Sequence, residues 1–168
     1  MKTAKRLLAL ALAGVMALAL LTGCSDSSSK ARQVEECFRS LMKQRGDYQK
    51  DKTLDKKLEV IAQKFQPNWL TGGGDMLTDD AQNIIKNELG DYLATGSVWL
   101  WYGEVKPDQS ALAQAESMKR PTGIEIATLA SGTSTLQAIA FTMTDKKSDD
   151  HRYYLALEAK ATINPPRN

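Results

Sequence analysis

The sequence predicts an α+β domain in which helices come first and a mainly antiparallel four-stranded sheet follows. Two observations predict this order. Up to about residue 93, apolar residues recur at steps of three and four, which is the period of a helix with one buried face. From residue 97 onward, β-branched, aromatic and alternating segments are separated by short polar connectors, which is typical of strands.

Three amphipathic helices are expected, over residues 30–45, 53–66 and from 79 to about Gly90. Pro67 ends the second helix because it lacks a backbone donor and clashes with the preceding turn. Thr78 is a good N-cap for the third helix, and the two aspartates that follow it are favourable beside the positive end of a helix.

Four strands are expected, over residues 97–106, 123–129, 135–144 and 151–163. The first is apolar on both of its faces and needs cover on both. The last alternates, so that one face is core and the other mostly wet. Polar connectors at 131–134 and 145–150 suit hairpins, which predicts a meander of the last three strands. Residues 110–118 form either a short helix or a long connection.

Helices followed by a curved meander resemble the cone-shaped folds of the nuclear-transport-factor-2-like kind. The resemblance lies in the order of the elements. It implies a sheet curved around a pocket, and it implies nothing about function, because one fold serves many activities.

The first residues have the pattern of an export signal. Lys2, Lys5 and Arg6 precede an uncharged apolar run of fifteen residues, Leu7 to Leu21. A membrane-spanning helix needs about 20 such residues, so this run is read as a signal peptide.

Leu21-Thr22-Gly23-Cys24 follows and resembles the lipobox of bacterial lipoproteins. That resemblance implies cleavage before Cys24 and attachment of lipid, palmitate included, to its thiol. Acyl chains on one residue would hold the protein on the extracytoplasmic face of the cell membrane. The expected organisation is a signal peptide over 1–23, a lipidated cysteine with a flexible tether over 24–30, and one α+β domain over 31–168.

Composition narrows the classes of partner. Three of the 22 basic residues and none of the 20 acidic ones lie in the signal, so the rest carries 19 basic and 20 acidic residues. No basic stripe indicates a nucleic-acid partner. With Cys24 lipidated, Cys37 has no cysteine to pair with, and it falls in the apolar stripe of the first helix, where a thiol is an inert small hydrophobe.

Several residue patterns were weighed as chemical sites. His151 stands beside Asp149 and Asp150, but neighbouring residues on one turn do not supply a metal with three convergent ligands, so a polar hairpin rim is expected. The run of glycines at 72–74 lacks the Lys-Ser/Thr of a phosphate loop and is expected to be a hinge or plain loop. No cofactor, metal or catalytic residue is predicted.

Trp99, Trp101 and Tyr102 are the candidate binding residues. The two tryptophans share one face of a strand, about 7 Å apart, and could form a platform for a sugar, a peptide or another chain, or be plain core. The first hypothesis is a binding module for a ligand or protein. A small enzyme would instead need a pocket with convergent residues such as Glu104, Glu125 or Tyr102. A homodimer that buries the second sheet face is a third alternative.

Overall fold

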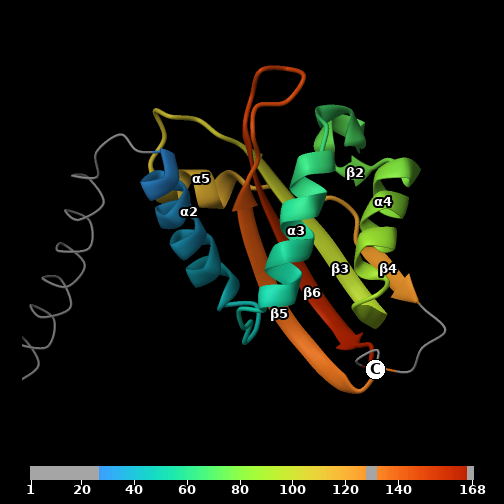
Figure 1. Ribbon diagram of the computed structural model, residues 1–168. Coiled ribbons are helices and arrows are strands. Elements are labelled where there is room, and N and C mark those ends of the chain that lie inside the picture. Colours follow the sequence, from blue (N-terminus) through green and yellow to red (C-terminus); the bar gives the residue numbers. More distant parts are fainter. Residues whose placement is uncertain (1–26, 128–131, 166–168) are drawn as a thin grey trace, which may run out of the picture.

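The computed structural model describes residues 27–127 and 132–165. It confirms the α+β class: helices come first, and an antiparallel sheet of order β4-β3-β6-β5 follows (Figure 1). The main helices are α2 (Ser27–Met42), α3 (Lys52–Lys64), α4 (Asp79–Leu89) and α5 (Ala111–Ser117). The strands of this sheet are β3 (Leu93–Glu104), β4 (Ile124–Ala127), β5 (Ser134–Met143) and β6 (Tyr153–Ile163).

Side-chain caps start three of these helices. Asp51 accepts from the Leu54 amide at 2.8 Å at the start of α3, and Thr78 caps α4 in the same way, as predicted. Residues 110–118, which the sequence left open between a helix and a connection, form helix α5 behind the N-cap Ser110.

One face of the sheet packs against α3 and α4 and forms the larger core (Figure 1). Fully buried residues of the two helices, such as Leu58 and Ile85, meet Leu100 of β3 and Leu157 of β6. A short 3₁₀ turn, η1 (Pro67–Trp69), and the small hairpin of β1 (Leu70–Thr71) and β2 (Met76–Leu77) extend this layer.

Helices α2 and α5 cover part of the other face (Figure 1). Phe38 of α2 packs edge to face on Trp101 of β3, with ring centroids 5.3 Å apart, and both join a second buried cluster that includes Ile139 and Tyr154. The two-sided apolar character of β3 is therefore satisfied within the chain. Helices on both faces leave the expected cone unconfirmed.

The prediction that β6 has a mostly wet face is wrong for most of its length. Every residue from Tyr153 to Ala159 is buried, and exposure begins only at Lys160. The reason is that α2 and α5 lie over this end of the second face, which a strand's own alternation does not reveal.

The predicted meander is also wrong in one connection. β5 and β6 form the expected hairpin, but β4 pairs with β3, so β4 and β5 stand at opposite edges of the sheet. The connector at 131–134 thus belongs to a crossover, and its first residue, like the end of the expected strand at 128–129, lies outside the described residues. β3 and β6, with apolar side chains on both faces, occupy the centre.

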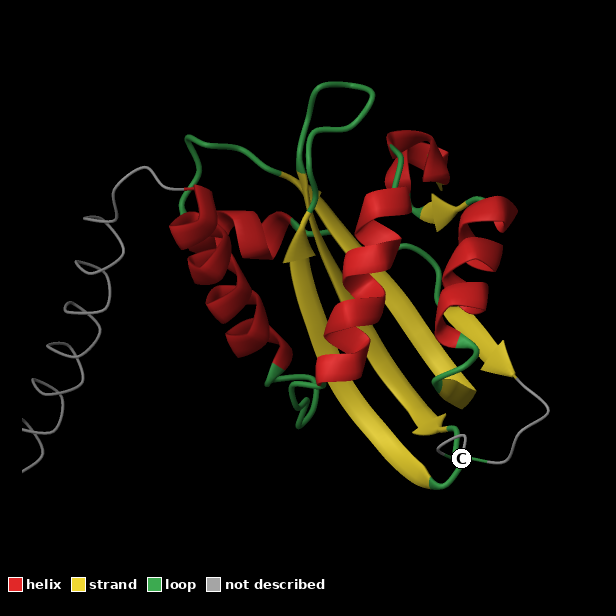
Figure 2. Cartoon of the chain, viewed as in Figure 1, coloured by secondary structure: helices red, strands yellow, loops and turns green. Residues whose placement is uncertain are grey.

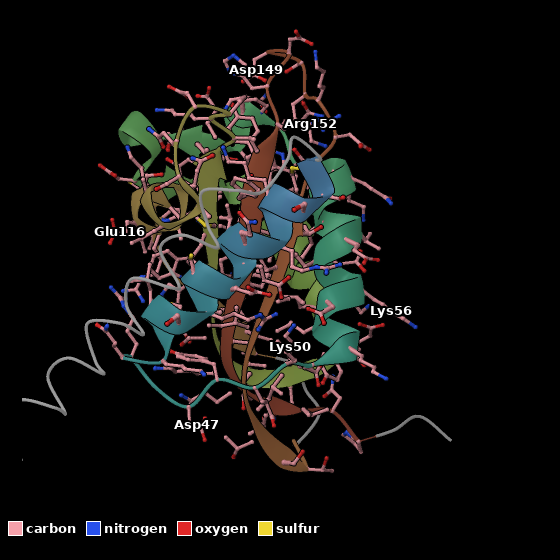
Figure 3. The ribbon with its side chains drawn as sticks, turned by 90° about the vertical axis from the view of Figure 1, so that its left-hand side faces the viewer. Asp47, Lys50, Lys56, Glu116, Asp149 and Arg152 are labelled. Atoms are coloured by element: carbon pink, nitrogen blue, oxygen red, sulfur yellow. The ribbon has the colours of Figure 1, made fainter. Side chains whose placement is uncertain are left out.

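The edge strand β5 is covered along part of its length. Residues 46–50 run beside it, with the Gln49 amide donating to the Gln137 carbonyl and the Ile139 amide donating to the Gln49 carbonyl. Arg39 of α2 donates to the Ile139 carbonyl at 2.8 Å. Figure 3 shows this segment, with Asp47 and Lys50, passing below α2. Such cover prevents edge-to-edge pairing with another chain.

Residues 27–30, which were expected to belong to a flexible tether, form the start of α2, which begins at Ser27. The residues of the signal peptide and Cys24 lie outside the described residues.

Candidate functional site

The two candidate tryptophans lie side by side on the second face of the sheet. Trp101 is buried under α2, with 8 % of its surface exposed, whereas Trp99 stands where the helical cover ends and is half-buried. Gly123 packs on the edge of Trp99: a Cβ there would lie 2.4 Å from the indole nitrogen. One tryptophan is therefore core, and the other is at the border of an uncovered surface.

Tyr102 is not brought together with the tryptophans. It points to the opposite face, where its hydroxyl donates to the Gly74 carbonyl at 3.0 Å. Gly74 has a φ of +94° in the turn η2 (Gly72–Gly74), and a Cβ there would collide with the Tyr102 hydroxyl. Tyr102 thus holds the glycine turn of the β1–β2 hairpin in place.

A buried carboxylate, which the sequence did not single out, lies beside the tryptophans. Glu158 of β6 is directly opposite Trp99 in the strand pairing and is 2 % exposed. It accepts hydrogen bonds from the Tyr48 hydroxyl and, at 3.0 Å, from the Trp101 indole N–H, and it pairs with Arg120 at 3.5 Å. A buried carboxylate needs such partners, because losing water without compensation costs several kcal/mol.

The Glu158 contact has an electrostatic consequence for its partner. Burial, followed by the hydrogen bond to Glu158, raises the pKa of Tyr48 far above its usual value. The hydroxyl therefore stays a neutral donor and holds residues 46–50 against the sheet.

Two arginines lie against the tryptophans. The guanidinium carbon of Arg120 is 5.3 Å from the ring centroid of Trp99 and 5.4 Å from that of Trp101. The guanidinium of Arg45 lies over Trp101 at 5.2 Å. Cations attract the negative face of an aromatic ring, so these contacts fix the two side chains in place.

A third cation completes the group, since the ammonium of Lys160 lies 5.4 Å from the ring centroid of Tyr48. Arg45 and Lys160 are exposed, and 37 % of the Arg120 side chain is exposed. These residues form what is called here the cation–aromatic cluster: Arg45, Tyr48, Trp99, Trp101, Arg120, Glu158 and Lys160.

Beyond this cluster, the second face of the sheet carries polar side chains. The Ser97 hydroxyl donates to Glu125 at 2.7 Å, and the hydroxyls of Thr95 and Thr162 are 3.0 Å apart. We call this part the open face. Its side chains are exposed or half-buried and belong to Thr95, Ser97, Glu125, Lys160 and Thr162.

A groove of about 500 Å³ beside α2 adjoins the cluster at Tyr48. One helical face of α2 and parts of residues 46–50 and β5 line it: Arg32, Glu35, Glu36, Arg39, Ser40, Lys43, Tyr48, Lys50 and Ile139. Glu35 is engaged by Arg39 at 2.7 Å and by Lys50 at 3.3 Å. Tyr48 is shared, so groove and cluster are contiguous.

The other candidates are dispersed. Glu104 faces His151 at 3.5 Å near the β5–β6 loop, whereas Glu125 of β4 accepts from Ser97 of β3, and Tyr102 lies on the opposite face. These residues do not converge on one pocket. Within residues 27–127 and 132–165, no group of three or more His, Cys, Asp or Glu could hold a metal ion.

Two further residues have structural roles. The β5–β6 loop extends beyond the strands (Figure 2), and Lys147 ties it to the end of α3 by donating to the Ala62 carbonyl at 2.7 Å. Cys37 is half-buried against the second cluster, and burial, followed by two neighbouring glutamates, raises the pKa of its thiol, as an inert cysteine requires.

Comparison with models of known protein families, with curated proteins and with solved structures found no match. No helix in the described part of the chain is long and apolar enough to cross a membrane.

Proposed function

We propose that this chain is a lipid-anchored extracytoplasmic binding protein that holds a ligand or protein partner at the cation–aromatic cluster and the open face. The observation that supports a binding site is that the cover of the second sheet face by α2 and α5 stops beside Trp99. Trp99 is half-buried there, and exposed cationic and hydroxyl side chains surround it. Aromatic and arginine side chains left accessible together are typical of binding surfaces.

The anchor is supported by the sequence features before α2. Basic residues, an apolar run and Leu21-Thr22-Gly23-Cys24 stand in the order of a lipoprotein signal. Only Ser25 and Asp26 separate Cys24 from the start of α2 at Ser27, and three residue steps span at most about 11 Å. On this proposal the domain works close to the membrane surface and meets extracytoplasmic molecules.

Metabolic labelling tests the anchor. In bacteria that express the full chain and are fed radioactive palmitate, we expect label on the wild type and none on Cys24→Ser. Cys37→Ser serves as the matched control and should keep the label, since its thiol is half-buried within the fold. Label that persists in Cys24→Ser would refute the anchor.

Crosslinking in the cell tests the surface. A photoreactive phenylalanine derivative is placed at Thr95 on the open face, or at Lys56 on α3, an exposed residue on another side of the molecule (Figure 3). We expect a discrete adduct from position 95 and none from position 56. An adduct with the mass of two copies would favour the homodimer instead, and equal yields from both positions would contradict a dedicated surface.

A further inference from the structure

The accessible charge of the cation–aromatic cluster is positive. Arg45, Arg120 and Lys160 are its three cations, and each has exposed surface. Glu158 is its one carboxylate, and it is 2 % exposed. The chain after the signal has slightly more acidic than basic residues, so this local excess does not follow from composition.

Both carboxylate oxygens of Glu158 are already engaged within the fold. One carboxylate oxygen accepts from Tyr48, and the other accepts from Trp101 and faces Arg120. A cationic ligand would therefore have to displace Arg120 from both the carboxylate and the two indole rings. The accessible groups favour a ligand of the opposite sign.

Arg120 has the geometry to receive an anion. A guanidinium carries five N–H donors in a planar fork, and the hydrogen bond of Arg120 to Glu158 is long, at 3.5 Å. The contacts with the rings of Trp99 and Trp101 restrain the guanidinium, which reduces the entropy lost when an anion binds. Phosphate and carboxylate groups match the arginine fork in a bidentate manner.

The surroundings of Trp99 define the rest of the ligand. A half-buried indole presents a flat apolar surface, and the hydroxyls of Thr95 and Thr162, together with the Ser97–Glu125 pair, lie along the same face of the sheet. A sugar ring has an apolar side that can lie on an indole and hydroxyls that can reach such polar neighbours.

We infer that the cation–aromatic cluster binds an anionic sugar, with its phosphate or carboxylate on Arg120 and its ring against Trp99. This inference rests on the proposed binding function and adds the chemical class of the ligand. Arg45 and Lys160 supply long-range attraction, so binding weakens as salt is added.

Calorimetry and tryptophan fluorescence on the lipidated chain in a non-ionic detergent test the inference. The probes are glucose 6-phosphate, glucuronate, glucose and inorganic phosphate. We expect one or both anionic sugars to bind at least about tenfold more tightly than glucose or phosphate alone, because only they engage both Arg120 and Trp99. Preference between the two sugars distinguishes a phosphate from a carboxylate.

Variants locate the site. Arg120→Gln and Trp99→Ala should each weaken the preferred sugar by about tenfold or more, the scale of a lost charge-assisted hydrogen bond. Lys160→Gln leaves the Glu158 contacts in place and should weaken binding less, with a smaller salt dependence. Lys56→Gln removes an exposed charge on another side of the molecule and should change affinity less than twofold.

Three results would overturn the inference: no saturable binding of either anionic sugar at millimolar concentration, equal affinity for phosphate alone, or unchanged binding in both Lys160→Gln and a folded Arg120→Gln. A site-specific adduct at Thr95 together with any of these results would leave the binding function standing and remove only the ligand class.

Discussion

Glu158 shows how one residue can make an apolar layer into a polar site. Its neighbours in β6, Leu157 and Ala159, are fully buried on the opposite face, and on its own face Ala156 lies beneath α2 and α5. The carboxylate is tolerated there because the phenol, the indole and the guanidinium around it replace water. The same contacts orient the aromatic rings of the cluster.

Removing one of these donors should measurably weaken the fold. We expect Tyr48→Phe to lower the free energy of unfolding by about 1.5–3 kcal/mol, because it leaves a buried carboxylate with one partner fewer. Urea unfolding followed by circular dichroism measures this change.

Tyr153→Phe is the matched control for that substitution. It also removes a hydroxyl that donates to a carboxylate, but the Asp149 side chain is 33 % exposed and water can replace the donor. Its cost should be clearly smaller. Equal costs for the two variants would mean that Glu158 does not depend on Tyr48.

Alternation along β3 was enough to predict part of the candidate site. It placed Trp99 and Trp101 on one face and Tyr102 on the other, and the structure has them so. Glu158 was beyond such reasoning, because its partners Tyr48 and Arg120 lie 110 and 38 positions away in loops. A lone acid within an otherwise buried strand was the one local signal.

At the scale of elements, local signals predicted the secondary structure of each segment better than its position in the fold. Thr78 and Gly90 bound α4 as expected, because caps act within one turn. The strand order did not follow, since a polar connector of a few residues serves a hairpin or part of a crossover equally well. The apolar residues on both faces of β3 correctly predicted that both faces are covered, but they did not predict which helices cover them.

The position of the candidate site follows from which helices cover each face of the sheet. α3 and α4 cover the first face over most of its length, whereas α2 and α5 cover only one end of the second. The uncovered end holds the polar residues of β3 and β6. The start of α2 lies at the covered end of this face, where Lys30 donates to the Pro107 carbonyl just after β3, so the proposed anchor and the open face are at opposite ends of the sheet.

On the scale of the whole described fold, residues 27–127 and 132–165, three tyrosine hydroxyls donate to carboxylates and join separate elements. Tyr48 ties residues 46–50 to β6, Tyr153 ties β6 to Asp149 in the β5–β6 loop, and Tyr92 ties the start of β3 to Asp51 before α3 at 2.9 Å. Burial, followed by the hydrogen bond to a carboxylate, raises the pKa of all three phenols above the usual value.

These raised pKa values predict a loss of stability in alkaline solution. The unfolded chain releases phenolic protons from about pH 10, whereas the folded chain still holds them, so the stability that these phenols contribute is full below that pH and falls as the pH rises further. Urea unfolding at neutral pH, near pH 9 and above pH 10 should show its largest loss of free energy in the last step. Cys37, whose raised pKa acts in the same direction from a lower pH, is present in every variant and accounts for a smaller loss near pH 9. Lys57, whose raised pKa acts in the same direction, is present in every variant, so the tyrosine share is read by difference.

Tyr48→Phe should lose less stability than the wild type between pH 9 and the highest pH, because it has one phenol fewer to keep protonated. An alkaline loss of the same size in Tyr48→Phe and the wild type would show that the Tyr48 hydroxyl is not held by Glu158 in solution.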